Sequence, residues 1–534
     1  MVIARISETT LPKTYERLVN ALHYVRQSCQ TVPVLSIIWL HPKHPIHHVQ
    51  ETLLRLGTAA SELDDRSSGR GLRGPLKRMA DIQSRTLRSA VCAANAVRLS
   101  VKLLSLRWRE RRKIEMLRRK QFDVVAKTWC FGLQRPSGED DFYYGDLQQR
   151  LARRGHRMLL LCGDSSETNW RQFADAQLST PDSNRIPELC LVPPWAPLKM
   201  LWTQLHSSRI LKGVAANAPD RLVETVARTA CLDVLSPSVT QNGLFYWIGR
   251  EAVRTWKPRA LVTLYEGHGW EKCMWWGAKA EDRACRTVGY QHTVVFPEAI
   301  GLTRPFVDIK ERSVPDIILA LGERTRDLIK DGHEKHQSHV IPFGTFRYGG
   351  RRVSSVAPAG RRHVLVIPEG LPFEIRALFD FAHECARLLP SHTFVLRSHP
   401  QWPISKALSE LGLDVLDLPN VIASDKNDID EDFARSSIVL YRGSSAVLYG
   451  LLAGLFPIYV HVYKKFDSDP LYVLQSWRKV CSTPEQFAEL VNEYEDMSAA
   501  KRDMEWQAAA AYVSEYAVPV DEHRVDAFLA EIHS

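Results

Sequence analysis

The sequence predicts an α/β protein made of two domains, each with its own parallel sheet. Short apolar runs of strand length alternate with segments of helical periodicity along most of the 534 residues, an alternation typical of parallel sheets. The runs are nearly continuous in apolar residues, as expected for strands buried on both faces. The pattern breaks at residues 347–362, which are rich in Gly, Pro, Ser and Arg. We interpret this break as a linker between a first domain, residues 1–346, and a second, residues 363–534.

Each predicted strand is a short apolar run bounded by turn residues or polar segments. In the first domain the runs occupy residues 32–40, 122–131, 157–162, 260–265, 287–291, 316–321 and 339–343. In the second they occupy residues 363–367, 392–396 and 437–441. Helical periodicity occurs at residues 143–154, 214–256 and 270–285. Residues 443–463 carry no Asp, Glu, Lys or Arg. Because Gly, Ser and Pro interrupt them, we expect a helix, a turn and a buried strand there, and not a membrane span.

A basic segment at residues 41–121 interrupts the first domain, and we expect it to be mostly helical. Residues 70–120 contain 16 lysines or arginines against three acidic residues, a local charge of +13 in a chain whose net charge is +9. Between Val97 and Arg109, apolar residues recur at helical spacing with basic residues between them. This pattern favours a helix on an anionic membrane surface. A solvated helical hairpin fits the charge equally well. Nucleic-acid binding is not expected, because aromatic residues are few.

The composition is that of an ordinary globular protein. Hydrophobic residues make up 45% of the chain and charged residues 25%. The ten cysteines include no CxxC pair and no zinc-like spacing with histidine, so we expect free thiols in a reducing compartment. Residues 1–16 lack the long apolar core of a signal peptide. We therefore expect a cytoplasmic protein.

Two motifs in the second domain follow predicted strands and carry residues suited to an anion. The first is Arg397-Ser398-His399-Pro400; the second, Arg442-Gly443-Ser444-Ser445, also opens a helical segment. Ligands of parallel sheets bind at the carboxyl ends of strands, and a helix start offers free N–H groups to an anion. The motifs predict a nucleotide-phosphate site, with Arg397 and Arg442 neutralising charge. Alternatively, His399 and Ser444 are ordinary helix caps and the arginines form structural ion pairs.

Two such domains, with these loops in the second, resemble the GT-B glycosyltransferases of bacterial surface-carbohydrate biosynthesis. Within that group, the order and strand-end position of His399-Pro400 and Ser444-Ser445 look most like those of transferases that use CMP-activated ulosonic acids, such as Kdo transferases and bacterial sialyltransferases. The resemblance covers mainly residues 260–460. It implies that both motifs hold CMP. It also places three further residues near the cytidine or the sugar: Glu369, Gly370 and Glu374.

The first domain is then expected to supply the acceptor site and the catalytic carboxylate. Residues 264–271 (LYEGHGWE) place Glu266 on a glycine turn between a strand and a helix, and the next strand ends at His292. Transfer through an oxocarbenium-like state needs a carboxylate as base or nucleophile. We assign that role to Glu266, with His292 as its proton-transfer partner. Further residues expected at the substrate are Gly267, His268, Gln291 and Tyr144.

Two alternatives to this assignment stay open. Asp140 and Asp141, at the end of the acidic loop 132–141, form with Tyr144 a rival catalytic cluster. Glu266 could instead cap the helix that starts near Trp270. The sequence does not decide which carboxylate is catalytic, nor whether the reaction inverts or retains configuration.

We expect no metal and no cofactor beyond the CMP-sugar, which is a substrate. GT-B enzymes usually lack a DxD metal site, and a CMP donor carries a single phosphate. The DxD spellings at residues 428–430 and 467–469 are interpreted as polar loops or helix starts. Phosphate charge should instead be stabilised by the helix start, the serines, His399 and the arginines.

The sequence therefore predicts a metal-independent glycosyltransferase, peripheral on the inner face of the cell membrane. It would move a ulosonic acid, Kdo or sialic-acid-like, from a CMP-activated donor to a surface glycan or lipid-linked acceptor, while residues 70–120 bind the anionic membrane surface. One alternative is a GT-B enzyme with a nucleoside diphosphate donor, or a CDP-glycerol-type phosphotransferase. The other is a basic, non-catalytic protein that binds membranes or nucleic acid.

Overall fold

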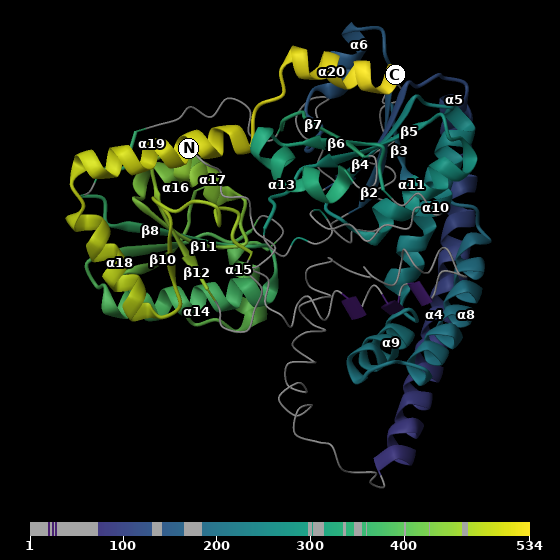
Figure 1. The fold of residues 1–534 in the computed structure, drawn as a ribbon, viewed down its shortest axis with the longest axis horizontal. Coiled ribbons are helices and arrows are strands. Elements are labelled where there is room, and N and C mark those ends of the chain that lie inside the picture. Colours follow the sequence, from purple (N-terminus) through teal and green to yellow (C-terminus); the bar gives the residue numbers. More distant parts are fainter. Residues whose placement is uncertain are drawn as a thin grey trace.

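The computed structural model comprises two parallel sheets covered by helices (Figure 1). It describes residues 73–130, 141–164, 184–296, 314–334, 338–346, 355–358, 360–399, 402–426, 428–461 and 468–534, with isolated positions between and before them. The predicted strand at 32–40, Pro400 and most of the predicted linker lie outside the described residues. The predicted fold class, α/β with two parallel-sheet units, is confirmed.

The first sheet has seven parallel strands in the order β3-β2-β1-β4-β5-β6-β7. Their bounds are β1 Val124–Cys130, β2 Met158–Asp164, β3 Arg185–Pro187, β4 Ala260–Tyr265, β5 Arg286–Gln291, β6 Ile317–Ala320 and β7 His339–Pro342. All but the short edge strand β3 coincide with predicted apolar runs. These strands are buried on both faces, which explains their near-continuous apolar sequences.

Helices cover both faces of this sheet. They are α4 Arg73–Arg109, α5 Arg111–Arg118, α6 Leu147–Arg153, the 3₁₀ turn η2 Glu188–Leu191, α8 Ala196–Ala216, α9 Arg221–Asp233, α10 Pro237–Trp256, α11 Gly269–Glu281 and α13 Glu323–Glu334. The described part of the predicted basic insertion is helical, with α4 alone 37 residues long and packed against α8 and α10, while residues 41–72 of the insertion lie outside the described residues.

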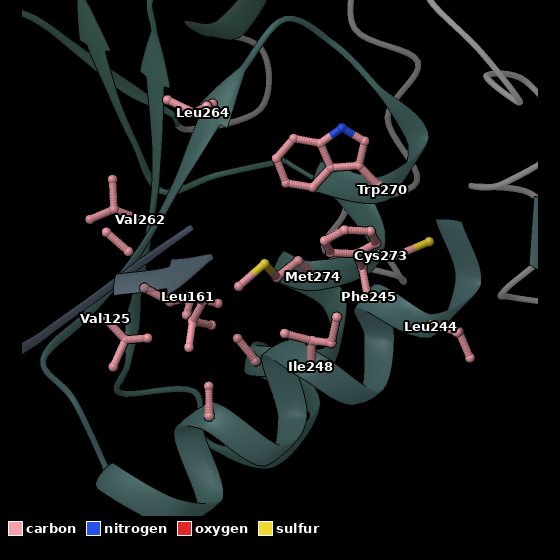
Figure 2. Packing of buried hydrophobic residues seen from close by; sticks show 14 of the residues in the cluster. Val125, Leu161, Leu244, Phe245, Ile248, Val262, Leu264, Trp270, Cys273 and Met274 are labelled. Carbon is pink, nitrogen blue, oxygen red and sulfur yellow. The ribbon is translucent and has the colours of Figure 1, made fainter. Parts of the chain in front are cut away.

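Helices α10 and α11 pack with almost touching backbones. A β-carbon on Gly249 would collide with the Met274 carbonyl, and one on Gly277 with the Tyr246 carbonyl, so only glycine fits at either crossing position. Phe245 and Ile248 of α10 and Met274 of α11 point toward the strands of the sheet (Figure 2). This packing fixes the start of α11, which follows the turn that carries Glu266.

The second sheet has six parallel strands in the order β10-β9-β8-β11-β12-β13. The strands are β8 His363–Pro368, β9 Thr393–Leu396, β10 Val421–Ala423, β11 Ile438–Arg442, β12 Phe456–Val460 and β13 Lys479–Cys481. The helices are α14 Pro372–Leu388, α15 Ile404–Leu411, α16 Ile429–Arg435, α17 Ala446–Leu452, α18 Pro484–Asp496 and α19 Ala499–Tyr516. Residues 443–460 form the helix, turn and strand predicted for this apolar segment.

The last helix, α20 Glu522–His533, returns to the first unit (Figure 1). Phe528 and Ile532 are buried in the core of the first unit, and Arg154 of α6 donates to Glu522 and Asp526 at 2.6 Å each. The sequence-based division placed all of residues 363–534 in the second domain. By packing, the final helix belongs with the first.

Candidate functional site

Both sheets have the strand order in which ligand sites form at one defined place. Counted within each unit, the first six strands follow the order 3-2-1-4-5-6, and such sheets bind ligands where the strand order reverses. The reversal lies between β1 and β4 in the first unit and between β8 and β11 in the second. The predicted motifs follow strands β4 and β5 in the first unit and strands β8, β9 and β11 in the second, so each sheet brings its motifs together at its switch point.

At the first switch point, Glu266 lies between two imidazoles. Its Oε1 is 2.7 Å from Nε2 of His292, and its Oε2 is 3.0 Å from Nε2 of His268. Because β4 and β5 are neighbouring parallel strands with Tyr265 paired to Gln291, the residues that follow them are adjacent. The Glu266 side chain is 22% exposed, so it remains reachable by a ligand. The predicted partnership of Glu266 with His292 is present in the structure.

The alternative role of Glu266 as a helix cap is filled by another residue, Glu271. The fully buried carboxylate of Glu271 accepts from the backbone N–H groups of Glu266, Gly267 and His268, at 2.9 Å each. Burial raises the pKa of Glu271 well above its usual value. Gly267 has φ +90, which only glycine adopts without strain. Glu271 and Gly267 therefore shape the turn and leave the Glu266 side chain to the site.

The ring of His292 is held by an aromatic neighbour, and one of its nitrogens has no hydrogen-bond partner in the described part of the chain. The ring of Tyr143 meets it edge-on, with centroids 4.7 Å apart. The Nδ1 atom of His292 is buried and has no hydrogen-bond partner among the described residues. Buried polar atoms without a partner are rare in proteins and call for an explanation. A bound ligand at Nδ1 would provide one.

Two of the predicted substrate contacts are occupied within the protein. Gln291 is fully buried and bonds the backbone of Thr293 and Leu321. Tyr144 is buried and donates from its hydroxyl to the Lys127 carbonyl at 3.0 Å. Both side chains support the loops around the site, and their polar atoms already have protein partners.

Asp141, the rival catalytic candidate, is almost fully buried and has four donors around it. Its carboxylate accepts from the Thr128 hydroxyl at 2.9 Å, from the backbone N–H groups of Tyr143 and Tyr144, and from Arg185 at 2.8 Å. A carboxylate this fully bonded anchors a loop, since taking up a proton would break these charge-assisted bonds. Of the two candidate carboxylates, Glu266 is the one that remains partly exposed.

At the second switch point, the segments that follow strands β8, β9 and β11 converge. A β-carbon on Gly370 would lie 2.8 Å from Nδ1 of His399, and one on Gly443 would lie 2.5 Å from Oε2 of Glu369. The imidazole and the carboxylate therefore rest against bare backbone. Gly443 has φ +68, in the left-handed region that favours glycine. Ser444 and Ser445, just before α17, are both partly exposed, and neither hydroxyl caps the helix.

The two predicted phosphate arginines instead form ion pairs with carboxylates. Arg442 is 1% exposed, binds Glu374 at 2.7 Å and donates to the Tyr459 hydroxyl at 2.7 Å. Arg397 binds the buried Asp432 at 2.6 Å. The structural alternative stated for these arginines is therefore the observed one. Glu374, which the resemblance placed near the cytidine or the sugar, is the buried counter-ion of Arg442.

A buried ion pair near the first site escaped sequence reasoning. Lys127, in the middle of β1, is fully buried with Nζ 3.4 Å from Glu188 and 2.9 Å from the ring centroid of Trp129. Burial lowers the pKa of Lys127 from 10.5 to about 8 and raises that of Glu188. A lysine inside an apolar run (VVAKTWC) is the signal that could have identified this pair.

No group of metal-binding side chains occurs among the residues that the structure describes. In the two DxD spellings, Asp467 lies outside the described residues, and Asp428 and Asp469 have other roles. Asp428 caps α16 through a hydrogen bond from the Asp430 N–H. Asp469 is buried, where it accepts from the Tyr441 hydroxyl at 2.6 Å and pairs with Arg478.

No family model matches this chain, and no curated protein matches its sequence. Solved structures match its fold. The glycotransferase of kitacinnamycin is 13% identical over 77% of this chain and 100% of that chain, with a TM-score of 0.43. The glycosyltransferase SnogD from Streptomyces nogalater is 15% identical over 77% and 100%, with a TM-score of 0.40. MurG from Acinetobacter baumannii is 11% identical over 77% and 100%, with a TM-score of 0.41. The likeness is one of fold alone.

Proposed function

We propose that the protein is a glycosyltransferase that takes a sugar from a nucleotide-activated donor and needs no metal ion. The observation that carries this proposal is Glu266, a partly exposed carboxylate held at the first switch point by His268 and His292. The second switch point presents an imidazole and two serine hydroxyls to a ligand. One unit thus offers a group that can move a proton, and the other offers groups that can bind a phosphate.

For the donor we propose a CMP-activated ulosonic acid. The charge at the second switch point supports a donor with one phosphate. Arg442 and Arg397 are each neutralised by a buried carboxylate, so within the described part of this cluster neither adds net positive charge. A monophosphate needs less neutralisation than a diphosphate. His399, Ser444 and Ser445 are the groups we assign to it.

Glu266 is the group that acts on the acceptor. In an inverting reaction, it takes the proton of the acceptor hydroxyl while that oxygen bonds to the anomeric carbon and CMP leaves with the electrons of the broken bond. In a retaining reaction, the carboxylate itself bonds to the anomeric carbon as CMP leaves with the electrons of the broken bond. The acceptor oxygen then displaces the carboxylate and gives its proton to a neighbouring imidazole. His268 and His292 hold the carboxylate in place. The buried Nδ1 of His292, which has no hydrogen-bond partner among the described residues, is the atom we assign to exchange a proton with the bound substrate.

We further propose that the enzyme works on the inner face of the cell membrane, lying against it along α4. Part of α4, Ser84–Arg109, is long and apolar enough to cross a membrane, although it packs against α8 and α10 along one side. Its other side exposes apolar side chains, each between 48% and 82% exposed: Leu87, Val91, Val97, Val101, Leu104 and Trp108. An apolar stripe flanked by basic residues suits a helix in the plane of an anionic membrane surface.

Calorimetric titration of CMP, CDP, UDP and GDP tests the donor assignment. We expect selective binding of CMP, which Ser444→Ala weakens about 10- to 100-fold, the worth of a hydrogen bond to a charged phosphate. His399→Ala should weaken it to a similar extent. Ser409→Ala, an exposed serine on α15, is the matched control and should bind CMP as the wild type does.

The outcomes separate the parts of the proposal. Preference for UDP or GDP would remove the ulosonate donor and keep the transferase. Absence of nucleotide binding would remove the transferase altogether. If CMP binds, incubation with CMP-Kdo and CMP-sialic acids should release CMP and form a glycosidic product with no phosphate in the new linkage, unlike the product of a CDP-glycerol-type phosphotransferase.

A further inference from the structure

A cavity lies where α4, η2, α8 and α10 meet in the first unit, apart from both switch points. It measures about 420 Å³. Its walls combine three arginines and two tryptophans with one acidic residue and two prolines: Arg107, Arg250, Arg254, Trp195, Trp247, Glu251, Pro193 and Pro194. Neither the catalytic carboxylate nor the nucleotide motifs reach it, so the proposed chemistry does not explain it.

The charges around the cavity leave an excess of positive charge. Glu251 is shared by Arg254 at 2.5 Å and by Arg118 at 3.0 Å, so two guanidinium groups face one carboxylate. Arg250 is paired with Glu281 at 2.8 Å. Arg107 contacts the Val192 carbonyl at 3.4 Å, and that is a neutral partner. The cavity therefore suits an anion that can accept from several guanidinium groups, as a phosphate does.

The start of α8 adds to this potential. Helix α8 is 21 residues long, begins beside Pro193 and Trp195 at the cavity wall, and has no acidic residue in its first turn. The positive end of its dipole is thus uncompensated by a local carboxylate. Trp195 meets Trp247 edge-on at 5.9 Å, which gives the cavity a rigid apolar wall.

Large exposed apolar side chains border the cavity on two helices. Trp195, Leu198 and Trp202 are spaced at i, i+3 and i+7 along α8 and therefore share a face, and Trp202 is 67% exposed. On α4, Trp108 directly follows the cavity residue Arg107 and is 82% exposed. Tryptophans beside arginines are the residues that anchor proteins at the boundary between lipid headgroups and acyl chains.

We propose that this cavity binds the phosphate of an anionic lipid headgroup while the neighbouring tryptophans enter the membrane interface. The inference rests on the membrane-surface role proposed for α4, and it adds a specific ligand, the lipid phosphate, to that role. A basic stripe alone attracts any anionic surface, whereas the cavity selects a phosphate through contacts from Arg107 and Arg254. It thus sets the position in which the enzyme sits on the bilayer.

Vesicle sedimentation tests the proposal, with full-length protein, no nucleotide sugar, and vesicles of phosphatidylcholine with or without phosphatidylglycerol. The test variant is Arg107→Gln with Arg254→Gln, which leaves Glu251 paired with Arg118. The matched control is Arg109→Gln with Arg112→Gln, which removes the same amount of charge from residues outside the cavity. Binding is measured at about 0.15 M and about 1 M salt, where the Debye length falls from about 8 to about 3 Å.

At low salt both double variants should bind phosphatidylglycerol vesicles less well, since each charge near the surface contributes about fivefold. At high salt the control should equal the wild type. At high salt the cavity variant should still bind the vesicles about tenfold more weakly, or more, for each arginine removed. Each of these arginines is proposed to contact the phosphate directly, and salt does not screen such a contact as it screens a distant charge. Equal losses in both variants at both salt concentrations would overturn the cavity assignment and leave only a general basic surface.

Two further results would also overturn it. Glycerol phosphate that binds the cavity in solution, with no vesicle binding, would point to a soluble ligand. A concentration-dependent dimer in light scattering, again without vesicle binding, would mean that a second copy covers the apolar face of α4. Ser444→Ala should keep full vesicle binding, so loss of the nucleotide site and loss of the lipid site are told apart.

Discussion

The two switch points share a strand order but distribute charge in opposite ways. In the first unit, ionisable groups converge where a ligand can reach them, and the Glu266 carboxylate contacts two imidazoles. In the second unit, the ion pair of Arg442 with Glu374 is buried on both sides. The groups that remain at the strand ends there are the hydroxyls of Ser444 and Ser445, the imidazole of His399 and the carboxylate of Glu369, beside glycines. The same topology thus carries the proposed proton-transfer site in one unit and the proposed nucleotide site in the other.

The largest expected effect tests the proton-transfer role. With the donor identified by calorimetry, Glu266→Gln should lower kcat by about 10²- to 10⁴-fold, the contribution of a positioned acid or base. The dissociation constant of CMP should not change, because the nucleotide is assigned to the other unit. Initial rates and titrations measure the two quantities. Glu224→Gln, an exposed carboxylate on α9, is the control. Full activity of Glu266→Gln would return the catalytic role to Asp141.

A second test asks whether Arg442 supports the fold or the ligand. Arg442→Met leaves the buried Glu374 without its partner and should destabilise the protein by about 3–5 kcal/mol in urea unfolding. The double variant Arg442→Met, Glu374→Leu should regain most of that stability and bind CMP as the wild type does. A folded double variant that no longer binds CMP would make Arg442 a phosphate ligand and erase the contrast between the two units.

A third test uses the buried lysine. Folded Lys127 has a pKa of about 8 instead of 10.5, so below pH 8 both folded and unfolded chains carry its proton and the cost of the buried charge is complete. Between pH 8 and 10.5 the folded chain loses the proton first. Stability should therefore rise there, by up to about 3 kcal/mol. Thermal unfolding against pH measures this gain relative to the double variant Lys127→Met, Glu188→Gln. If the stability of the wild type and that of the double variant changed with pH in the same way, Lys127 would not be a buried charged group.

The sequence predicted the strands wherever a long apolar run decided the matter. A run such as Ala260–Tyr265 is apolar along its whole length, and a strand buried on both faces of a parallel sheet accommodates such a run. The three-residue strands β3, β10 and β13 could not be recognised, because each is short or contains polar residues. Their place in the sheets is decided by neighbours distant in the chain.

The same limit applies to the sites. The meeting of Glu266 and His292 was predictable because adjacent parallel strands bring their ends together. The roles of the arginines were not, since the partner of Arg442 lies 68 residues away and that of Arg397 lies 35 away. Asp141 was likewise ambiguous until Arg185, 44 residues later, appeared beside it. Spacing along the chain shows which groups end strands, and only tertiary contacts show which of them are already neutralised.

The return of α20 to the first unit has a practical consequence for engineering donor specificity. The second unit is topologically an insertion, because the chain enters it after residue 346 and leaves it before Val520, which packs in the first core. A chimera that exchanges everything after the linker would strip Phe528 and Ile532 from the first core and expose the apolar surface beneath them. A graft that retains the native tail should also retain Tyr516, because its buried hydroxyl bonds the backbone of Val295 in the first unit.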